Sequence, residues 1–373
     1  MDDSQTDQHR SPAEQAPKTG TSDVDINIDI NIKDRHFMPR RWLRGGHVQT
    51  VASFLIGRRL HLSEPEERFV EVEPDVRVLC HCHWQPNRAS ALTVIIVHGL
   101  EGSSDSQYML GVTQKALKAG MNVIRFNQRN CGGTDSLAPV LYHSGLSNDV
   151  AAVARNVIAS DGISRVALVG FSMGGNIVLK LAGEWGSEAP AQLRAVVAVC
   201  PAIDLATSAD ALHERGNRIY ERYFLWALRR RMRQKARLFP GKFDIKRLRG
   251  IRSLREFDDK VTAYYCGFTG VDDYYDRASA AHVVGRIAVP TLILYAANDP
   301  FVRITAQTRI KIAANQNIMF VETEDGGHCA FMGTPVKSSA HRGRSVKDSR
   351  SADGNDGYWA EHEIVNFLRG LNR

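Results

Sequence analysis

The sequence has little of what marks secreted, membrane-spanning or repeat proteins. Its six cysteines in 373 residues are too few and too scattered for a disulfide framework. No apolar run approaches the ~20 residues that a bilayer-spanning helix needs, no basic-then-apolar signal segment begins the chain, and no internal repeat is found. We therefore expect a cytoplasmic globular protein whose cysteines are reduced thiols.

A strong excess of one charge is also absent. The net charge is +7 at pH 7, and 24% of the residues are charged, as in ordinary soluble proteins. This balance gives no reason to expect a nucleic-acid partner or an obligate protein partner. The length allows a large buried core, either in one elaborated α/β domain or in two domains.

Two stretches are poor in large apolar groups. Residues 1–34 are rich in Asp, Ser, Gln and Thr, which predicts a disordered N-terminal tail, and the polar, basic residues 333–357 predict a mobile loop. Residues 37–54 form the first segment with large apolar side chains. We expect five of these to anchor the segment across the edge of the core: Phe37, Trp42, Leu43, Val51 and Phe54.

Short apolar runs alternate with helical patterns along most of the chain. This alternation favours a mainly parallel sheet flanked by helices, the α/β class. A hairpin over residues 68–84, turned at Pro74-Asp75, comes before these runs. The runs predict buried strands at six places: 92–97, 122–126, 166–169, 195–200, 291–295 and 318–321.

The hairpin contains consecutive metal-binding residue types, from Cys80 to His83. In a strand, neighbouring side chains point to opposite faces, so one metal ion could take only two of them. The spacing of a zinc site is also missing. We therefore predict a structural role for this run and no metal.

The strand pattern stops after Pro201. Residues 204–280 contain no clear strand, so we interpret them as a helical cap inserted into a core formed by residues 35–203 and 281–373. Apolar residues recur at helical spacing in the cap: Tyr220, Phe224, Leu228 and Met232. The opposite face is basic and is either a solvated surface or a site of weak attraction to anionic membranes or acidic substrates: Arg222, Arg229, Arg230, Arg233 and Arg237.

The sequence from Arg165 to Leu181 predicts a strand that turns sharply into a helix at Gly170-x-Ser172-x-Gly174. Such a turn holds the serine hydroxyl at its tip in a strained conformation, and the glycines remove side chains that would collide. Three fixed residues at this spacing arise by chance in roughly one chain in eight of this length. Phosphate binding is disfavoured, because the serine replaces a required glycine and no Gly-Lys-Ser/Thr follows.

Two further residues support Ser172 as a nucleophile. Asp299 and His328 each follow a predicted strand, and the order Ser, Asp, His is that of the α/β-hydrolase arrangement. His328 would take the serine proton, and Asp299 would orient the imidazole. Asp325 is the rival acid, but it lies only three residues before the histidine and can hardly reach the far side of its ring.

A pair of backbone N–H groups completes the predicted site. The loop after the strand at 92–97 contains His98-Gly99-Leu100, and such a loop normally offers one N–H to an oxyanion. The residue after the nucleophile offers the second. We therefore predict an oxyanion hole formed by Leu100 and Met173.

From Phe37 to the C-terminus, the chain resembles the YheT-like family of α/β-hydrolases, which also contains eukaryotic lipases and fatty acid ester synthases. The family pattern implies the triad Ser172, Asp299 and His328 and no cofactor. Asn130 stands where the family usually has glycine, and asparagine can adopt the same left-handed turn. The long loop after His328 is a further departure. Seven stretches carry the resemblance: WLRGGHVQT (42–50), HGLEGS (98–103), RNCGG (129–133), YHSG (142–145), GFSMGGN (170–176), NDP (298–300) and GGH (326–328).

These residues favour a serine hydrolase that cleaves short- to medium-chain or lipid esters through an acyl-enzyme. An acyltransferase that passes the same acyl group to an alcohol would use the same residues, although His143 and Asp149 lack the His-x4-Asp spacing of one acyltransferase motif. A catalytically silent binding protein on this fold is a third hypothesis. The apolar cap residues either pack the cap onto the sheet or line an acyl pocket over Ser172.

Overall fold

The computed structural model describes residues 37–335 and 356–371. The predicted tail at 1–34 lies outside these residues, and so does most of the predicted loop at 333–357. Among the described residues, all helices are too short or too polar to cross a membrane. The six cysteines are unpaired.

The described strands form one eight-stranded sheet with the order β1-β2-β4-β3-β5-β6-β7-β8. The hairpin β1–β2 is antiparallel and pairs antiparallel with β4, whereas the remaining neighbours are parallel. This confirms the predicted sheet. The strand bounds are β1 Glu66–Glu73, β2 Val76–His83, β3 Thr93–Val97, β4 Asn122–Phe126, β5 Val166–Phe171, β6 Leu193–Val199, β7 Thr291–Ala296 and β8 Ile318–Thr323.

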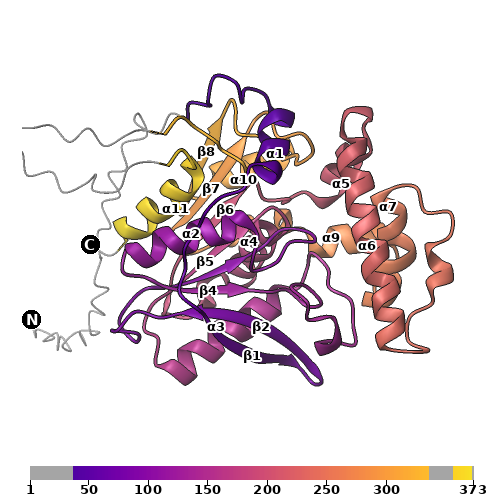
Figure 1. Ribbon diagram of the computed structural model, residues 1–373, viewed down its shortest axis with the longest axis horizontal. Coiled ribbons are helices and arrows are strands. Elements are labelled where there is room, and N and C mark those ends of the chain that lie inside the picture. Colours follow the sequence, from indigo (N-terminus) through magenta and orange to yellow (C-terminus); the bar gives the residue numbers. More distant parts are fainter. Residues whose placement is uncertain (1–36, 336–355, 372–373) are drawn as a thin grey trace, which may run out of the picture. The chain divides into compact units, whose positions relative to one another are not determined.

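Helices cover the sheet, and the central strands β3, β4 and β5 are buried along their whole length, as expected for parallel strands packed on both faces. Helices α2 and α11 pack together, as do α3 and α4 (Figure 1). The helices outside the β6–β7 segment are α1 Gly46–Leu55, α2 Gln107–Lys118, α3 Ser147–Asp161, α4 Met173–Trp185, α10 Ala306–Ala313 and α11 Trp359–Gly370.

The segment between β6 and β7 contains only helices, turns and loops, and it lies beside one end of the sheet (Figure 1). Its long helix α6 carries the apolar stripe that the sequence predicted. A π-helical turn at Asp258–Ala263 joins two of the shorter helices. The helices here are α5 Leu205–His213, α6 Arg218–Leu238, α7 Leu254–Phe257, α8 Tyr264–Cys266 and α9 Val271–Ala278.

The prediction that residues 37–54 are anchored by five apolar side chains is wrong for three of them. Leu43 is buried, and Phe37 is half-buried against Phe331. Trp42 and Phe54 are 66% and 64% exposed, and Val51 is 39% exposed. For Val51 and Phe54 the reason is that α1 lies on the surface and buries only a narrow face, made of Gln49, Thr50 and Ala52; Trp42 lies in the turn before this helix.

The Cys80–His83 run alternates between the two faces of β2. Cys80 and Cys82 lie in the hydrophobic core. His81 lies 3.1 Å from the Ser104 hydroxyl, and His83 lies 3.4 Å from the Arg125 guanidinium. The structure therefore separates the sulfurs from the imidazoles.

Candidate active site

Ser172 occupies the turn between β5 and α4. Its backbone has φ 53° and ψ −119°, a left-handed conformation that costs about 1–3 kcal/mol for a residue with a side chain. The two glycines of the motif are sterically required. A Cβ at Gly170 would lie 2.2 Å from the carbonyl oxygen of Gly174, and one at Gly174 would lie 2.3 Å from that of Val97.

The structure brings the three predicted side chains into one chain of contacts. His328 Nε2 lies 2.9 Å from Ser172 Oγ, and His328 Nδ1 lies 2.7 Å from Asp299 Oδ2. Asp299 is 2% exposed, and its other oxygen accepts hydrogen bonds from the backbone N–H groups of Phe301 and Val302 at 3.1 and 2.9 Å. These backbone donors fix the carboxylate in the orientation that faces the imidazole.

The electrostatics of this group favour a proton on His328. Burial lowers the pKa of His328, but the Asp299 carboxylate and the Cys329 sulfur more than offset it, so the pKa lies well above its ordinary value. The same negative neighbours stabilise the imidazolium that forms when His328 accepts the serine proton.

Asp325, the rival acid, makes its hydrogen bonds with groups other than the imidazole. Its Oδ1 accepts a hydrogen bond from the Gly45 backbone N–H at 3.0 Å and another from the Asn298 side chain. It therefore ties the loop before His328 to the start of α1. Its role in the structure is to join two loops, and Asp299 alone of the two acids contacts His328.

Helix α1 supports the His328 loop, which sequence reasoning missed. The Thr50 hydroxyl accepts a hydrogen bond from the His328 backbone N–H at 2.8 Å. Gln49 accepts one from the Met332 N–H at 2.8 Å and donates one to the Met332 carbonyl at 3.2 Å. The available signal was the WLRGGHVQT stretch, whose polar residues form the buried face of a surface helix.

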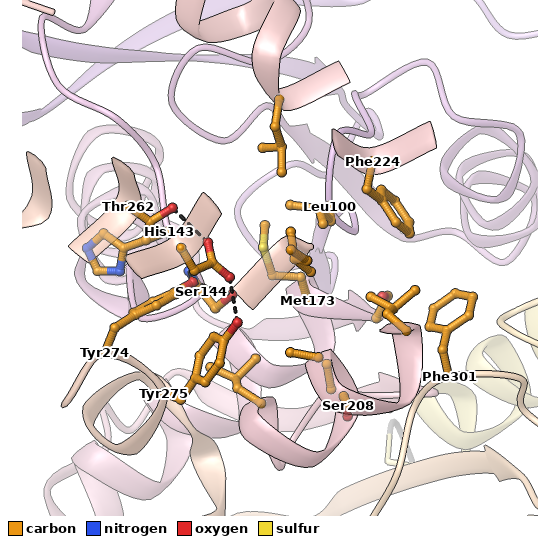
Figure 2. Close-up of a pocket in the computed structure, with 18 of the residues that line it drawn as sticks. Leu100, His143, Ser144, Met173, Ser208, Phe224, Thr262, Tyr274, Tyr275 and Phe301 are labelled. Atoms are coloured by element: carbon orange, nitrogen blue, oxygen red, sulfur yellow. Dashed lines mark hydrogen bonds between the residues drawn. The ribbon is translucent and has the colours of Figure 1, made fainter. Parts of the chain in front are cut away.

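The two predicted oxyanion donors lie beside Ser172. Leu100, Met173 and Ser172 line one cavity, and Figure 2 shows Leu100 and Met173 at its centre. Helix α4 begins at Met173, so the Met173 N–H belongs to the first turn, where N–H groups have no partner within the helix. A negative charge near Ser172 Oγ would face the positive end of this helix.

Buried polar groups hold the loop that carries Leu100. His98 Nδ1 donates to the Gly99 carbonyl at 2.7 Å, and its Nε2 accepts from the Gln128 N–H at 3.2 Å, an assignment set by these partners. Burial lowers the pKa of His98 to about 4, so this imidazole is neutral. The Gly99 N–H donates to the Tyr108 hydroxyl at 3.0 Å.

Glu101, next to Leu100, connects the same loop to α6. Its φ is 56°, and its carboxylate accepts hydrogen bonds from the Tyr142 hydroxyl at 2.6 Å and from Arg231 Nε at 2.8 Å. The Glu101 N–H donates back to the Tyr142 oxygen at 3.2 Å. Sequence reasoning missed this connection, because nothing local distinguishes Arg231 from the exposed arginines of the same helix.

The apolar face of α6 serves both packing and the cavity. Met232 is buried in the core, whereas Phe224 and Leu228 line the cavity next to Ser172. Tyr220 packs against Phe301, with ring centroids 5.2 Å apart. Four of the five basic residues are exposed; the exception, Arg229, donates to the Ile251 carbonyl.

A buried lysine joins α6 to the turn after β4. Lys235 Nζ donates to Asn130 Oδ1 at 2.8 Å and to the Asp135 carbonyl at 2.9 Å. Burial lowers the pKa of Lys235 to about 8. Asn130 has φ 67°, which confirms the predicted left-handed turn.

The cavity under α6 is apolar near Ser172 and polar at its far end. Phe224, Leu228 and Phe301 belong to the apolar part. The polar end contains Asp258, whose carboxylate accepts hydrogen bonds from Thr262 at 2.7 Å and Tyr275 at 2.8 Å (Figure 2). Burial raises the pKa of Asp258 to about 6. The remaining polar residues at this end are His143, Ser144 and Tyr274.

A second cavity opens on the other side of Ser172. Its lining is more mixed and includes the side chains of Arg58, Tyr223, His328 and Cys329. Ser172 therefore lies where two cavities meet, one under α6 and one toward α1 and α2.

One group beside Ser172 has the donor atoms of a metal site. Cys200, His328 and Cys329 offer two sulfurs and one nitrogen within 4.8 Å of one another, a set that suits Zn²⁺. However, His328 Nε2 contacts Ser172 Oγ and its Nδ1 contacts Asp299. Metal binding through Nε2 would therefore exclude the contact with the serine.

The comparisons with known proteins agree with the fold. Residues 93–335 match the model of a family described as "alpha/beta hydrolase fold". Among solved structures, "2,6-dihydroxy-pseudo-oxynicotine Hydrolase" superposes with a TM-score of 0.52 at 14% identity, covering 87% of this chain and 71% of that one. An esterase of Pyrococcus furiosus superposes with a TM-score of 0.50 at 15% identity, covering 84% and 97%. The chain therefore belongs to the α/β-hydrolase family.

Curated relatives confirm the resemblance to the YheT-like family. The chain is 32% identical to the Escherichia coli protein named "Putative esterase YheT", over 80% of this chain and 87% of that protein. It is 28% identical to mouse "Phospholipase ABHD3" and 27% identical to a yeast "Monoacylglycerol lipase", over 64% of this chain in both cases. The match spans 58% of the mouse protein and 54% of the yeast protein.

Proposed function

We propose that the protein is a serine esterase that cleaves carboxylic esters through an acyl-enzyme on Ser172. The observation that carries the proposal is the uninterrupted chain of contacts from Ser172 Oγ through His328 to the Asp299 carboxylate. A lone serine at a strand-to-helix turn would be a weak nucleophile, and this chain supplies both the base and the group that orients it.

The proposed reaction has two steps. Ser172 Oγ attacks the ester carbonyl while His328 Nε2 accepts the hydroxyl proton, and Asp299 stabilises the resulting imidazolium. The carbonyl oxygen becomes an oxyanion that the N–H groups of Leu100 and Met173 bind, and its collapse expels the alcohol, which takes the proton from His328. A water molecule, deprotonated by His328, then attacks the acyl group and releases the acid.

The substrate's two halves would occupy the two cavities. We propose that residues 204–280 act as a cap and that the acyl chain lies under it, against Phe224, Leu228 and Phe301. The alcohol half would face the second, more polar cavity. The limited apolar stretch before Asp258 favours short to medium acyl chains, and the names of the relatives, esterase, phospholipase and lipase, are consistent with ester substrates.

A chain-length screen tests this proposal. Hydrolysis of p-nitrophenyl esters from acetate to dodecanoate is measured for the wild-type protein and for Ser172→Ala, and a parallel arm adds excess alcohol. We expect hydrolysis with a short- to medium-chain optimum and at least a 10³-fold loss in the variant. Equal activity of the two proteins would refute the proposal, and a new ester as the main product would identify an acyltransferase instead.

A further inference from the structure

Two cysteines lie directly against the proposed catalytic base. Cys200 follows β6 with φ 42°, and Cys329 follows His328 with φ 59°. The Cys329 backbone N–H lies 3.4 Å from Cys200 Sγ, and Cys329 Sγ lies 4.0 Å from His328 Nε2. The two sulfurs and one imidazole nitrogen of His328 all lie within 4.8 Å of one another. Both thiols therefore lie within a few ångströms of the His328 imidazole that contacts Ser172.

The two thiols differ in access to solvent. Cys329 is partly exposed and lines the cavity that opens toward α1 and α2. Cys200 is fully buried behind it. A small reagent that enters this cavity therefore meets Cys329 first, and Cys200 is the thiol placed to react next.

The two thiols also differ in pKa, and Cys329 is again the more reactive of the two. Burial raises the pKa of Cys329, but its contacts with Cys200 and His328 outweigh this and lower the pKa to about 6. Burial raises the pKa of Cys200 well above its ordinary value. These contacts favour the thiolate of Cys329 over that of Cys200, and the thiolate is the form that reacts with oxidants.

We propose that Cys329 is an oxidation site for hydrogen peroxide and that Cys200 converts the product into a disulfide that stops ester cleavage. The Cys329 thiolate attacks one peroxide oxygen, the O–O bond breaks, and hydroxide leaves, so sulfur is oxidised to sulfenic acid and peroxide is reduced. The Cys200 thiol then attacks the sulfenic sulfur, an S–S bond forms, and the hydroxyl leaves with the thiol proton as water. A dithiol reductant reverses the change.

The disulfide would stop catalysis by moving His328. An S–S bond is about 2.05 Å long, so Cys329 must move toward Cys200, and its backbone is bonded to that of His328. A displacement of about 1 Å in a catalytic group is enough to cost about 10²-fold in rate. This effect on rate depends on the proposed function, whereas formation of the disulfide does not.

The experiment treats the protein with hydrogen peroxide in the presence of a metal chelator and measures two quantities. The first is esterase activity before and after treatment, and again after dithiothreitol. The second is peptide mapping under non-reducing conditions, where trypsin would release residues 195–215 linked to residues 312–337. We expect the linked peptide to appear as activity falls at least tenfold, and both changes to reverse with dithiothreitol.

Variants make the result specific, and each is compared with its own reduced form. Cys329→Ser should keep its activity under peroxide and form no linked peptide. Cys200→Ala should form no linked peptide and should resist the rapid, reversible inactivation; any activity that it loses slowly should not return with dithiothreitol, because an unresolved sulfenic acid oxidises further. Cys266→Ser, which changes a partly buried cysteine of the helical segment, should behave as the wild type.

Three outcomes would overturn the proposal. These are inactivation that persists in Cys329→Ser, inactivation of the wild type without the linked peptide, and a linked peptide with full activity. If the reduced protein hydrolyses no ester, the proposed function fails, and the linked peptide alone decides whether Cys200 and Cys329 form the oxidation site.

Discussion

The loops at the carboxyl ends of the strands and the helical segment 204–280 meet at Ser172, but they are built differently. In the loops, backbone geometry fixes each group: Ser172 has a positive φ, and Asp299 and His328 are held by hydrogen bonds to or from backbone N–H groups. In the helical segment, side-chain packing dominates, as for Phe224 and Leu228 along the cavity. On the proposed function, the loops would determine whether an ester is cleaved, and the helices would determine which ester.

The largest effect on kcat is expected in the loops, where Asp299 and Asp325 are the two candidate acids. Asp299→Asn should lower kcat by about 10³–10⁴-fold for every ester, because the imidazole loses the group that sets its tautomer and stabilises its charge. Asp325→Asn should lower kcat less than tenfold, because Asp325 joins two loops and does not contact His328. Steady-state kinetics of both variants measure this difference. A larger loss of kcat in Asp325→Asn would show that Asp325 is the catalytic acid.

The pH profile of the same variant gives an independent check. His328 must be neutral to accept a proton, so wild-type kcat/KM should fall as pH decreases through its raised pKa. Removing the Asp299 charge lowers that pKa, and the acidic limb of the residual activity should move to lower pH. A limb that does not move would show that another group titrates there.

An intermediate effect is expected where the two regions are joined. Arg231→Gln removes the guanidinium that holds Glu101 and with it the Leu100 loop. We expect kcat to fall by about 10–10²-fold at nearly constant KM, because oxyanion binding occurs only in the transition state. The control is Arg233→Gln, which changes an exposed arginine of the same helix. Equal losses of kcat in both variants would show that Arg231 does not act through Glu101 and the Leu100 loop.

The smallest effect, and the sharpest test of the comparison, comes from the cavity wall. Phe224→Ala and Leu228→Ala should move the preferred acyl length by a few carbons and barely change acetate hydrolysis, since each buried methylene contributes ~0.8 kcal/mol at most. Ile219→Ala, at a 69% exposed position of the same helix, is the control. The measurement is kcat/KM across the ester series, with thermal unfolding alongside. A uniform loss at every length that tracks lost stability would mean that these residues only pack.

Much of this arrangement follows from local patterns in the chain. The buried strands are short runs of apolar residues, and the strand-to-helix turn at Ser172 needs its two glycines whatever surrounds it. Because parallel strands end at the same edge of a sheet, Asp299 and His328 could be placed near Ser172 from their positions after predicted strands. The left-handed turn at Asn130 was instead predicted from the family resemblance, because the family usually has glycine there and asparagine tolerates the same conformation.

The missed features are contacts between distant segments. Thr50 supports His328 across 278 positions, and Arg231 reaches Glu101 across 130, and no local period indicates either pair. Trp42 and Phe54 were assigned to the edge of the core because they are large and apolar, but Trp42 lies exposed in the turn before α1 and Phe54 on the exposed face of that helix. The polar end of the cavity was missed because Asp258 lies in a π-helical turn outside the apolar stripe of α6.

The central claim, that Ser172 is the nucleophile, is tested most directly by locating the site of a fluorophosphonate label. The protein is treated with the reagent, digested and mapped by mass spectrometry, with Ser172→Ala treated in parallel. The account predicts one phosphonyl group on Ser172, concurrent loss of esterase activity, and no label on the variant, whose thermal unfolding is unchanged. A label on another residue, or equal labelling of the variant, would contradict it.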